Sequence, residues 1–294
     1  MAIELGSSTF GLLDPLGGAA DVARRTLRVL HPLSFVEDPT RIFRAARYAA
    51  RLGFSLDPWS ARARALALEL APYAELSPAR IAAELERILA DSGPDRALVT
   101  LARAGAFRLL DPRYRPGRAT ARLARVPATL AWARERRLAV PGLELLAAAL
   151  AAGQPREVSA VVLRQLGLRG APLERVRAAL DGTDTLAARL QAARRASEAA
   201  RLARASSPTA LAWLHLEGDA PARARLERRL LPAGQGRPEL GGDAVIALGV
   251  ARGPDVARVL GALRDARLDG EIRDRQGEID YVKSWLEHHM KKEG

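Results

Sequence analysis

Glu37, Asp38 and Arg41 are the residues of this chain whose types and spacing could recognise a small polar ligand. Pro39 suits the first position of a helix because it has no N–H to satisfy there, and Asp38 just before it suits an N-cap. The pairing edges of cytosine and adenine both present an amino donor beside a ring-nitrogen acceptor. Asp38 could accept from the amino group and Arg41 could donate to the ring nitrogen. Uracil and guanine present the reverse pattern, and each buried polar group left unpaired costs about 1–3 kcal/mol.

The helix that must carry these groups has a basic side and an apolar side. At about 3.6 residues per turn, the side of Arg41 also carries Arg44, Arg47 and Arg51. The opposite side carries Ile42, Ala45, Ala46 and Ala49. A carboxylate and a guanidinium backed by positive charge could hold a nucleotide. The alternative is purely structural, a capped helix with a Glu37–Arg41 ion pair and a solvated arginine face.

Three consecutive stretches of this segment carry a family resemblance: residues 37–41, 42–47 and 52–54. They read Glu-Asp-Pro-Thr-Arg, Ile-Phe-Arg-Ala-Ala-Arg and Leu-Gly-Phe. The pattern resembles the nucleotide-selecting motif of the class II tRNA nucleotidyltransferases (CCA-adding enzymes) and their bacterial poly(A) polymerase relatives.

The resemblance implies a role for each residue of the motif. Asp38 and Arg41 would read the incoming CTP or ATP, and Glu37 would orient the arginine. Arg44 and Arg47 would support them from the same helix.

Further stretches resemble the same family in the family's order. Leu13–Gly18, Leu-Asp-Pro-Leu-Gly-Gly, is similar to a turn of the catalytic head. Ser77–Glu84 is similar to a helix-supporting motif in which Arg80 and Glu84 would brace the selecting helix. The alternative for those two residues is an exposed pair four positions apart on one helix, which contributes a few tenths of a kcal/mol, roughly 0.2–0.5. Gly242–Pro254 is similar to the start of the tail.

The catalytic carboxylates of the family are not found in this sequence. In the family, an Asp-x-Asp pair in the head holds two metal ions, and the sequence contains no Asp-x-Asp. The family's Arg-Arg-Asp-Phe-Thr motif would lie immediately before Met1, so we expect the chain to begin in the last piece of the head. We therefore expect no catalytic residue, no metal site and no cofactor bound by this chain alone. Mg²⁺ and CTP or ATP are implied for the full-length enzyme, with the head missing or supplied separately.

The expected fold is all-α, a multi-helical neck, body and tail with at most a small α/β remnant of the head. Aromatic residues make up 4% of the chain and β-branched runs are short, so strand signals are nearly absent. Residues 1–28 form the head remnant and junction, 29–92 the nucleotide-selecting neck, 93–220 the helical body and 221–294 the RNA-binding tail. In the neck, Asp57-Pro58 and Ser77-Pro78 are expected to start helices, with Leu66 and Leu70 facing inward.

The net charge of +12 favours a nucleic-acid partner. Nearly all the positive charge is arginine, whose planar fork can bind two phosphate oxygens at once. The tail begins with a basic run that we expect to contact the tRNA backbone, namely Arg223, Arg225, Arg228 and Arg229. The alternatives are a solvated basic face and an arginine content that reflects genome composition alone.

Other classes are disfavoured by what the sequence lacks. There is no cysteine, hence no disulfide framework. No apolar run reaches the ~18 residues of a membrane-spanning helix, and the N-terminus does not resemble a signal peptide. We expect a cytoplasmic protein with no membrane partner.

Three hypotheses follow for the function. The first is the neck, body and tail of an enzyme that adds C or A to tRNA 3′ ends. The second is an RNA-binding module without catalysis. The third is a helical adaptor protein. Tyr114, between Arg113 and Arg115, could stack on RNA, although a loop aromatic is the simpler interpretation.

Overall fold

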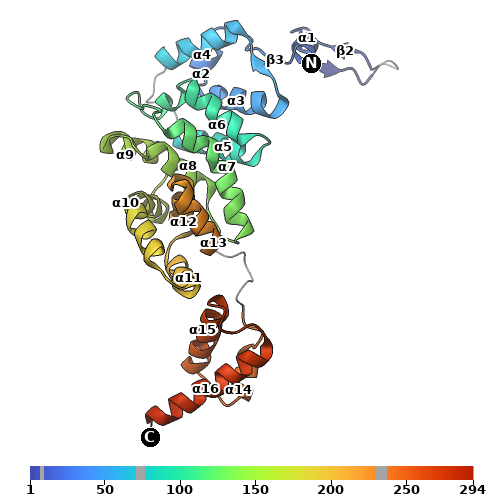
Figure 1. The fold of residues 1–294 in the computed structure, drawn as a ribbon. Coiled ribbons are helices and arrows are strands. Elements are labelled where there is room, and N and C mark those ends of the chain that lie inside the picture. The colour runs from blue at the N-terminus through green and yellow to red at the C-terminus, as the bar shows by residue number, and fades with distance from the viewer. Residues whose placement is uncertain (7–9, 71–76, 230–236, 294) are drawn as a thin grey trace. The chain divides into compact units, whose positions relative to one another are not determined.

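The computed structural model describes residues 1–6, 10–70, 77–229 and 237–293. These residues are mostly helical, with two small two-stranded sheets, as Figure 1 shows. The expected all-α class with a small N-terminal α/β portion is confirmed. The chain divides into two compact units, which are described separately. The first comprises Met1–Ala131 and Val140–Asp181, and the second comprises Trp132–Ala139 and Gly182–Gly294.

The first unit begins with the two sheets and a short helix. Strand β1 (Ala2–Ile3) pairs antiparallel with β2 (Leu12–Leu13), and β3 (Thr26–Leu27) pairs parallel with β4 (Ser55–Leu56). Between them lies helix α1 (Gly18–Ala23). The Asp14 carboxylate accepts the backbone N–H groups of Gly18 and Ala19 at 2.8 and 2.7 Å, which fixes the turn that precedes this helix.

The helices that follow position the candidate site. In chain order they are α2 (Ser34–Glu37), α3 (Thr40–Leu52), α4 (Pro58–Leu70), α5 (Pro78–Ala90), α6 (Pro94–Arg103) and the short 3-10 helix η2 (Ala106–Leu109). Their apolar faces form a core whose largest members are Phe35, Phe43, Phe107, Ile81 and Leu85. The amphipathic α3 buries Ile42 and Phe43 in this core, so its other side is free to carry the arginines.

The predicted helix boundaries are largely correct in this region. Asp57 accepts the backbone N–H groups of Trp59 and Ser60 at 3.0 and 3.3 Å, which caps α4. Helix α3 ends at Gly53, whose φ of 67° is the left-handed conformation that glycine adopts most readily. The expected inward face of α4 is wrong, since Leu66 and Leu70 are exposed. The inward side of that helix is instead built mainly from small residues, namely Ser60, Ala63, Ala67 and Leu68.

The remaining helices complete the two units. The first unit continues through α7 (Ala119–Glu135), α8 (Gly142–Ala151), α9 (Arg156–Gln165) and α10 (Gly170–Ala192), of which α7 and α10 extend into the second unit. The second unit adds α11 (Ala196–Ala205), α12 (Pro208–Glu217), α13 (Ala220–Arg229), α14 (Gly242–Ala247), α15 (Pro254–Leu268) and α16 (Arg275–Glu293).

The last three helices share a small apolar core. Val245, Val259, Leu263 and Val282 are fully buried in it. Helix α15 starts at Pro254. The buried Glu278 carboxylate accepts the backbone N–H groups of Glu239 and Leu240 at 2.9 and 2.8 Å, and Arg267 Nη1 lies 3.1 Å from its Oε1. A buried charge is tolerated there because two backbone N–H groups donate to it and the Arg267 guanidinium lies beside it.

Large exposed apolar side chains are concentrated in one part of the sequence. Among the side chains that the structure describes, those of this kind all lie within residues 1–70. Leu5, Phe10 and Leu30 are 83%, 63% and 62% exposed.

Candidate nucleotide-selecting site

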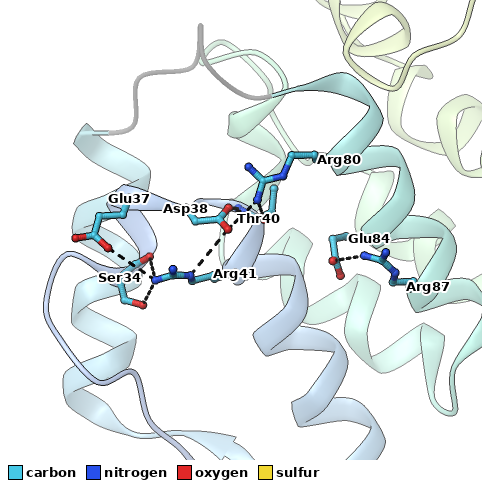
Figure 2. A network of polar contacts seen from close by, with 8 residues as sticks. All are labelled: Ser34, Glu37, Asp38, Thr40, Arg41, Arg80, Glu84 and Arg87. Atoms are coloured by element: carbon cyan, nitrogen blue, oxygen red, sulfur yellow. Dashed lines mark hydrogen bonds and ion pairs between the residues drawn. The ribbon is translucent and has the colours of Figure 1, made fainter.

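Asp38 lies at the junction between α2 and α3, with its carboxylate held on both sides. Its Oδ1 accepts the backbone N–H of Thr40 at 3.1 Å and the Thr40 hydroxyl at 2.5 Å. Its Oδ2 accepts from Arg80 Nη2 at 2.8 Å (Figure 2). The prediction of one helix capped by Asp38 is refined here. The short α2 ends at Glu37, and α3 begins at Thr40, whose N–H is capped by Asp38.

The Asp38 carboxylate is stabilised in its ionised form. Partial burial acts to raise its pKa, but the hydrogen bonds from Thr40 and Arg80 outweigh that effect and lower the pKa below its ordinary value. Asp38 is therefore a fixed hydrogen-bond acceptor at neutral pH.

Arg41 lies next to Asp38 and is held by Ser34, the first residue of α2. Its Nη1 donates to the backbone oxygen of Ser34 at 3.1 Å and to the Ser34 hydroxyl at 2.8 Å. The same atom lies 3.9 Å from Glu37 Oε2, and Arg41 Nε lies 3.9 Å from Asp38 Oδ2 (Figure 2). Glu37 also lies 3.3 Å from His31 Nε2. The structure thus brings together all three residues that the sequence proposes for nucleotide binding.

A cavity of about 280 Å³ opens beside Arg41. Its polar wall is formed by Arg28, Arg41, Arg44 and Tyr48, and its apolar wall by Leu27, Val29, Phe35, Ala45 and Leu56. Of the three proposed nucleotide-binding residues, Arg41 is the one on this wall. The Asp38 and Glu37 carboxylates are not part of this wall. Each lies 3.9 Å from Arg41, which is part of it.

Tyr48 gives the cavity a flat aromatic surface within a cluster of arginines. The Arg47 guanidinium carbon lies 4.6 Å from the ring centroid and that of Arg51 lies 5.9 Å away. Hydrogen bonding with Arg44 lowers the pKa of the Tyr48 phenol, against an opposing effect of burial. Arg44 and Tyr48 are thus two polar groups of the wall that neighbour each other one helical turn apart.

Arg80 and Glu84 make their described contacts with different residues. Arg80 Nη2 bonds Asp38 Oδ2 and also donates to the Thr40 hydroxyl at 3.2 Å. Glu84 is buried and accepts from Arg87 Nη1 at 2.5 Å (Figure 2). The structure therefore contradicts the alternative interpretation, in which Arg80 and Glu84 form an exposed ion pair with each other. Arg80 links α5 directly to the start of α3.

Arg47 is held inside the protein by two carboxylates. Its Nη1 donates to Asp91 Oδ2 at 3.0 Å, and its Nε lies 4.0 Å from Glu84 Oε2. The side chain is only 14% exposed, so Arg47 is not on a solvated arginine face. The exposed Arg51 lies 3.9 Å from the same Asp91 oxygen. Sequence reasoning missed Asp91, Thr40 and Ser34. The first is 44 residues from its partner, and neither of the others stands out by residue type.

The predicted RNA-binding arginines belong to α13. Arg223 is half-buried, while the side chains of Arg225, Arg228 and Arg229 lie outside the described part of the structure. Tyr114 is buried, and its ring meets the edge of Phe107 at a centroid distance of 6.0 Å. The stacking surface on RNA that Tyr114 could have offered is therefore not available.

The described residues contain neither a metal-binding cluster nor a membrane-spanning helix. In them, no group of three or more His, Cys, Asp or Glu side chains is placed so that it could hold a metal ion. Nor does any helix in the described ranges have the length and apolar character needed to cross a membrane.

The chain is similar in sequence to known tRNA nucleotidyltransferases. Compared with protein-family models, it matches none. It is 33% identical to the CC-adding tRNA nucleotidyltransferase of Deinococcus radiodurans over 94% of this chain and 60% of that protein. It is 37% identical to the A-adding tRNA nucleotidyltransferase of Geobacter sulfurreducens over 38% of this chain and 13% of that protein.

The fold is similar to that of solved structures. The CCA-adding enzyme of Thermotoga maritima, complexed with tRNA, matches with a TM-score of 0.73 and 23% identity, over 93% of this chain and 67% of that one. A CCA-adding enzyme in complex with ATP matches with a TM-score of 0.71 and 24% identity, over 97% and 69% of the two chains. The chain spans less than two thirds of the length of the two named nucleotidyltransferases that it matches in sequence. The chain is thus similar along nearly its whole length to a tRNA nucleotidyltransferase, which confirms the family resemblance of its motifs.

Proposed function

We propose that this chain is the nucleotide-selecting and RNA-binding part of an enzyme that adds C or A to the 3′ ends of tRNA. The observation that carries the proposal is the position of Arg41. It lies on the wall of the 280 Å³ cavity, held by Ser34, with ionised Asp38 3.9 Å away. The relatives named as CC-adding and A-adding tRNA nucleotidyltransferases support the same assignment.

The proposed selection rests on hydrogen-bond direction. Arg41 is always a donor, and Asp38 is ionised and hence always an acceptor. A cytosine or adenine edge satisfies both groups, whereas a uracil or guanine edge opposes donor to donor and acceptor to acceptor. Asp38 Oδ2 already accepts from Arg80 but retains lone-pair capacity for a second donor. Tyr48 offers a face for the base, and Arg28 and Arg44 offer charge for the phosphates.

The transfer step itself is not assigned to these residues. The two metal ions that the family resemblance implies do not fit any donor set among the described residues. In this proposal, Mg²⁺ and the carboxylates that hold it belong to the full enzyme, outside the described residues. The second candidate, an RNA-binding module without catalysis, is favoured by the net charge of +12 and shares the RNA partner.

Calorimetric titration of the chain with each of the four nucleoside triphosphates tests the proposal. We expect CTP and ATP to bind about tenfold or more tighter than UTP and GTP. Arg41→Ala and Asp38→Asn should abolish that difference. The matched control is Arg103→Ala, an exposed arginine at the end of α6 outside the cavity, which should preserve it. Equal affinity for all four nucleotides, or no binding, would refute nucleotide selection and leave the RNA-binding module.

A further inference from the structure

A second and larger cavity lies in the first unit, apart from the nucleotide-selecting one. Its volume is about 640 Å³, and it shares no lining residue with the first. It lies between the segment that follows η2 and the first turn of α9. Three of its lining residues are arginines, Arg108, Arg113 and Arg115, and one, Glu157, is acidic.

Arg113 is fixed in place by the buried Asp111. Its Nε and Nη2 donate to the two carboxylate oxygens at 3.0 and 2.8 Å, and its backbone N–H donates to Oδ1 at 2.8 Å. The bidentate pair raises the pKa of Arg113 further and lowers that of Asp111. This part of the cavity wall is therefore rigid as well as charged.

Arg115 is presented from an equally fixed backbone. A single side-chain amide, that of Gln154, accepts its backbone N–H at 3.2 Å and donates to its backbone oxygen at 2.6 Å. Within the described part of the chain, the guanidinium groups of Arg108 and Arg115 make no ion pair. Both side chains are exposed. Two charged donor groups are thus available at a wall that the protein holds still.

The opposite wall adds a helix start and apolar surface. Helix α9 begins at Arg156 after Pro155, and the N–H groups of a first helical turn have no partner within their helix. Pro155 and Val158 line the cavity together with Pro112. Tyr114 also lines it, and its buried hydroxyl has no hydrogen-bond partner among the described residues.

We propose that this cavity binds a phosphate group of the RNA backbone, with the adjoining nucleoside against the wall formed by Pro112 and Pro155. Arg108 and Arg115 would donate to the phosphate oxygens, and Arg113 would set the charge of the wall behind them. The contact is to backbone and shape, and it carries no base-edge readout. The inference rests on the proposed function in one respect, namely that RNA is the partner. Glu157 opposes the bound anion, so its removal should tighten binding.

The test measures the affinity of the whole chain for tRNA across a range of salt concentrations. The double variant Arg108→Gln/Arg115→Gln should bind about tenfold more weakly and lower the magnitude of the salt slope by about one. Glu157→Gln should bind a few-fold more tightly. The control Arg164→Gln removes an exposed arginine from the far end of the same α9 and should change affinity less than about twofold. Thermal unfolding of each variant verifies that it is folded.

Photocrosslinking locates the contact independently of affinity. With 4-thiouridine-substituted tRNA, the wild-type chain should crosslink at residues 108–115 or 155–158, and the double variant should lose that crosslink. Calorimetric titration with inorganic phosphate alone tests whether the cavity binds a free phosphate ion and not a phosphate of RNA. Should the double variant lose phosphate binding but bind tRNA as the control does, the site serves a free anion and the RNA assignment is overturned.

The outcomes separate this inference from the proposed function. If tRNA binds wild type and double variant equally and no crosslink forms in the cavity, the cavity inference fails and nucleotide selection is untouched. If the four nucleoside triphosphates bind alike while the double variant still loses tRNA, nucleotide selection fails and the cavity inference stands. If the wild-type chain binds no RNA, both are overturned.

Discussion

Arg80 Nη2 lies 2.8 Å from Asp38 Oδ2, although 42 residues separate the two in the sequence. This ion pair joins the start of α5 to the start of α3 and helps to keep Asp38 ionised. It gives Arg80 a role in positioning the carboxylate that is proposed to accept from the base.

Arg80→Gln should therefore change selectivity more than stability. Because Arg80 is 59% exposed, the loss in free energy of unfolding should be below about 1 kcal/mol. The preference for CTP and ATP over UTP and GTP should fall, because Asp38 loses the donor that fixes its orientation. Nucleotide titrations and urea unfolding measure the two effects. A variant with unchanged nucleotide preference would show that Arg80 does not position Asp38.

Arg47→Ala should destabilise the first unit strongly. Arg47 is largely buried between Asp91 and Glu84, and removing one partner of a buried ion pair typically costs about 3–5 kcal/mol. We expect about 3 kcal/mol, the lower end of that range, because Glu84 retains Arg87. Urea unfolding measures it, with the exposed Arg103→Ala as the control. A loss below about 1 kcal/mol would mean that the network adds little to stability.

His215 should make the second unit less stable in mild acid. It stacks on Trp132 with ring centroids 4.1 Å apart and lies 3.0 Å from Glu227 Oε1. Burial lowers its pKa below the ordinary 6.5, and the interaction with Glu227 opposes this only in part. The unfolded chain thus binds the proton more readily than the folded one. This contribution to stability is complete above pH 6.5 and is lost as the pH falls through the lowered pKa.

His215→Phe, which keeps a flat ring, should flatten this dependence. The melting temperature measured between about pH 5 and 7.5 should vary less in His215→Phe than in the wild type. His288→Phe, at an exposed position of α16, serves as the matched control and should retain the wild-type slope. Identical slopes in all three proteins would rule out His215 as the titrating group.

Glu278→Ala should loosen the segment that leads into α14. The carboxylate accepts two backbone N–H groups, those of Glu239 and Leu240, which would be left without it. Each buried donor left unsatisfied costs about 1–3 kcal/mol. Hydrogen exchange of those two amides should accelerate by a factor of ten or more, on the order of 1.4 kcal/mol per tenfold. Unchanged exchange at both positions would contradict the role assigned to Glu278.

Local signals in the sequence were sufficient for several elements. Asp57 before Pro58 marks the start of α4, and Ser77 before Pro78 marks the start of α5. In each case the residue acts through backbone groups within a few positions of itself, which is the range over which spacing carries information.

Other features depend on contacts that spacing does not encode. The Arg47–Asp91 pair joins residues 44 apart, so helical spacing alone could not show that the alternative of a solvated arginine face fails for Arg47. The inward side of α4 was misjudged because the helix is alanine-rich. Ala63 and Ala67 are buried, so neighbouring segments of the protein can pack close to α4, while Leu66 remains exposed to solvent. The three residues at the α2–α3 junction were identified from residue type, spacing and a family motif, while their partners Ser34 and Thr40 were not.

The exposed leucines and phenylalanine near the N-terminus have a practical consequence for work with the isolated chain. Leu5, Phe10 and Leu30 expose apolar side chains to water, and such side chains can drive self-association at high protein concentration. Light scattering at rising protein concentration should reveal clustering that moderate salt does not dissolve, because hydrophobic contact is not screened as charge is. Binding assays are therefore best performed at low protein concentration, where self-association cannot be mistaken for a loss of affinity.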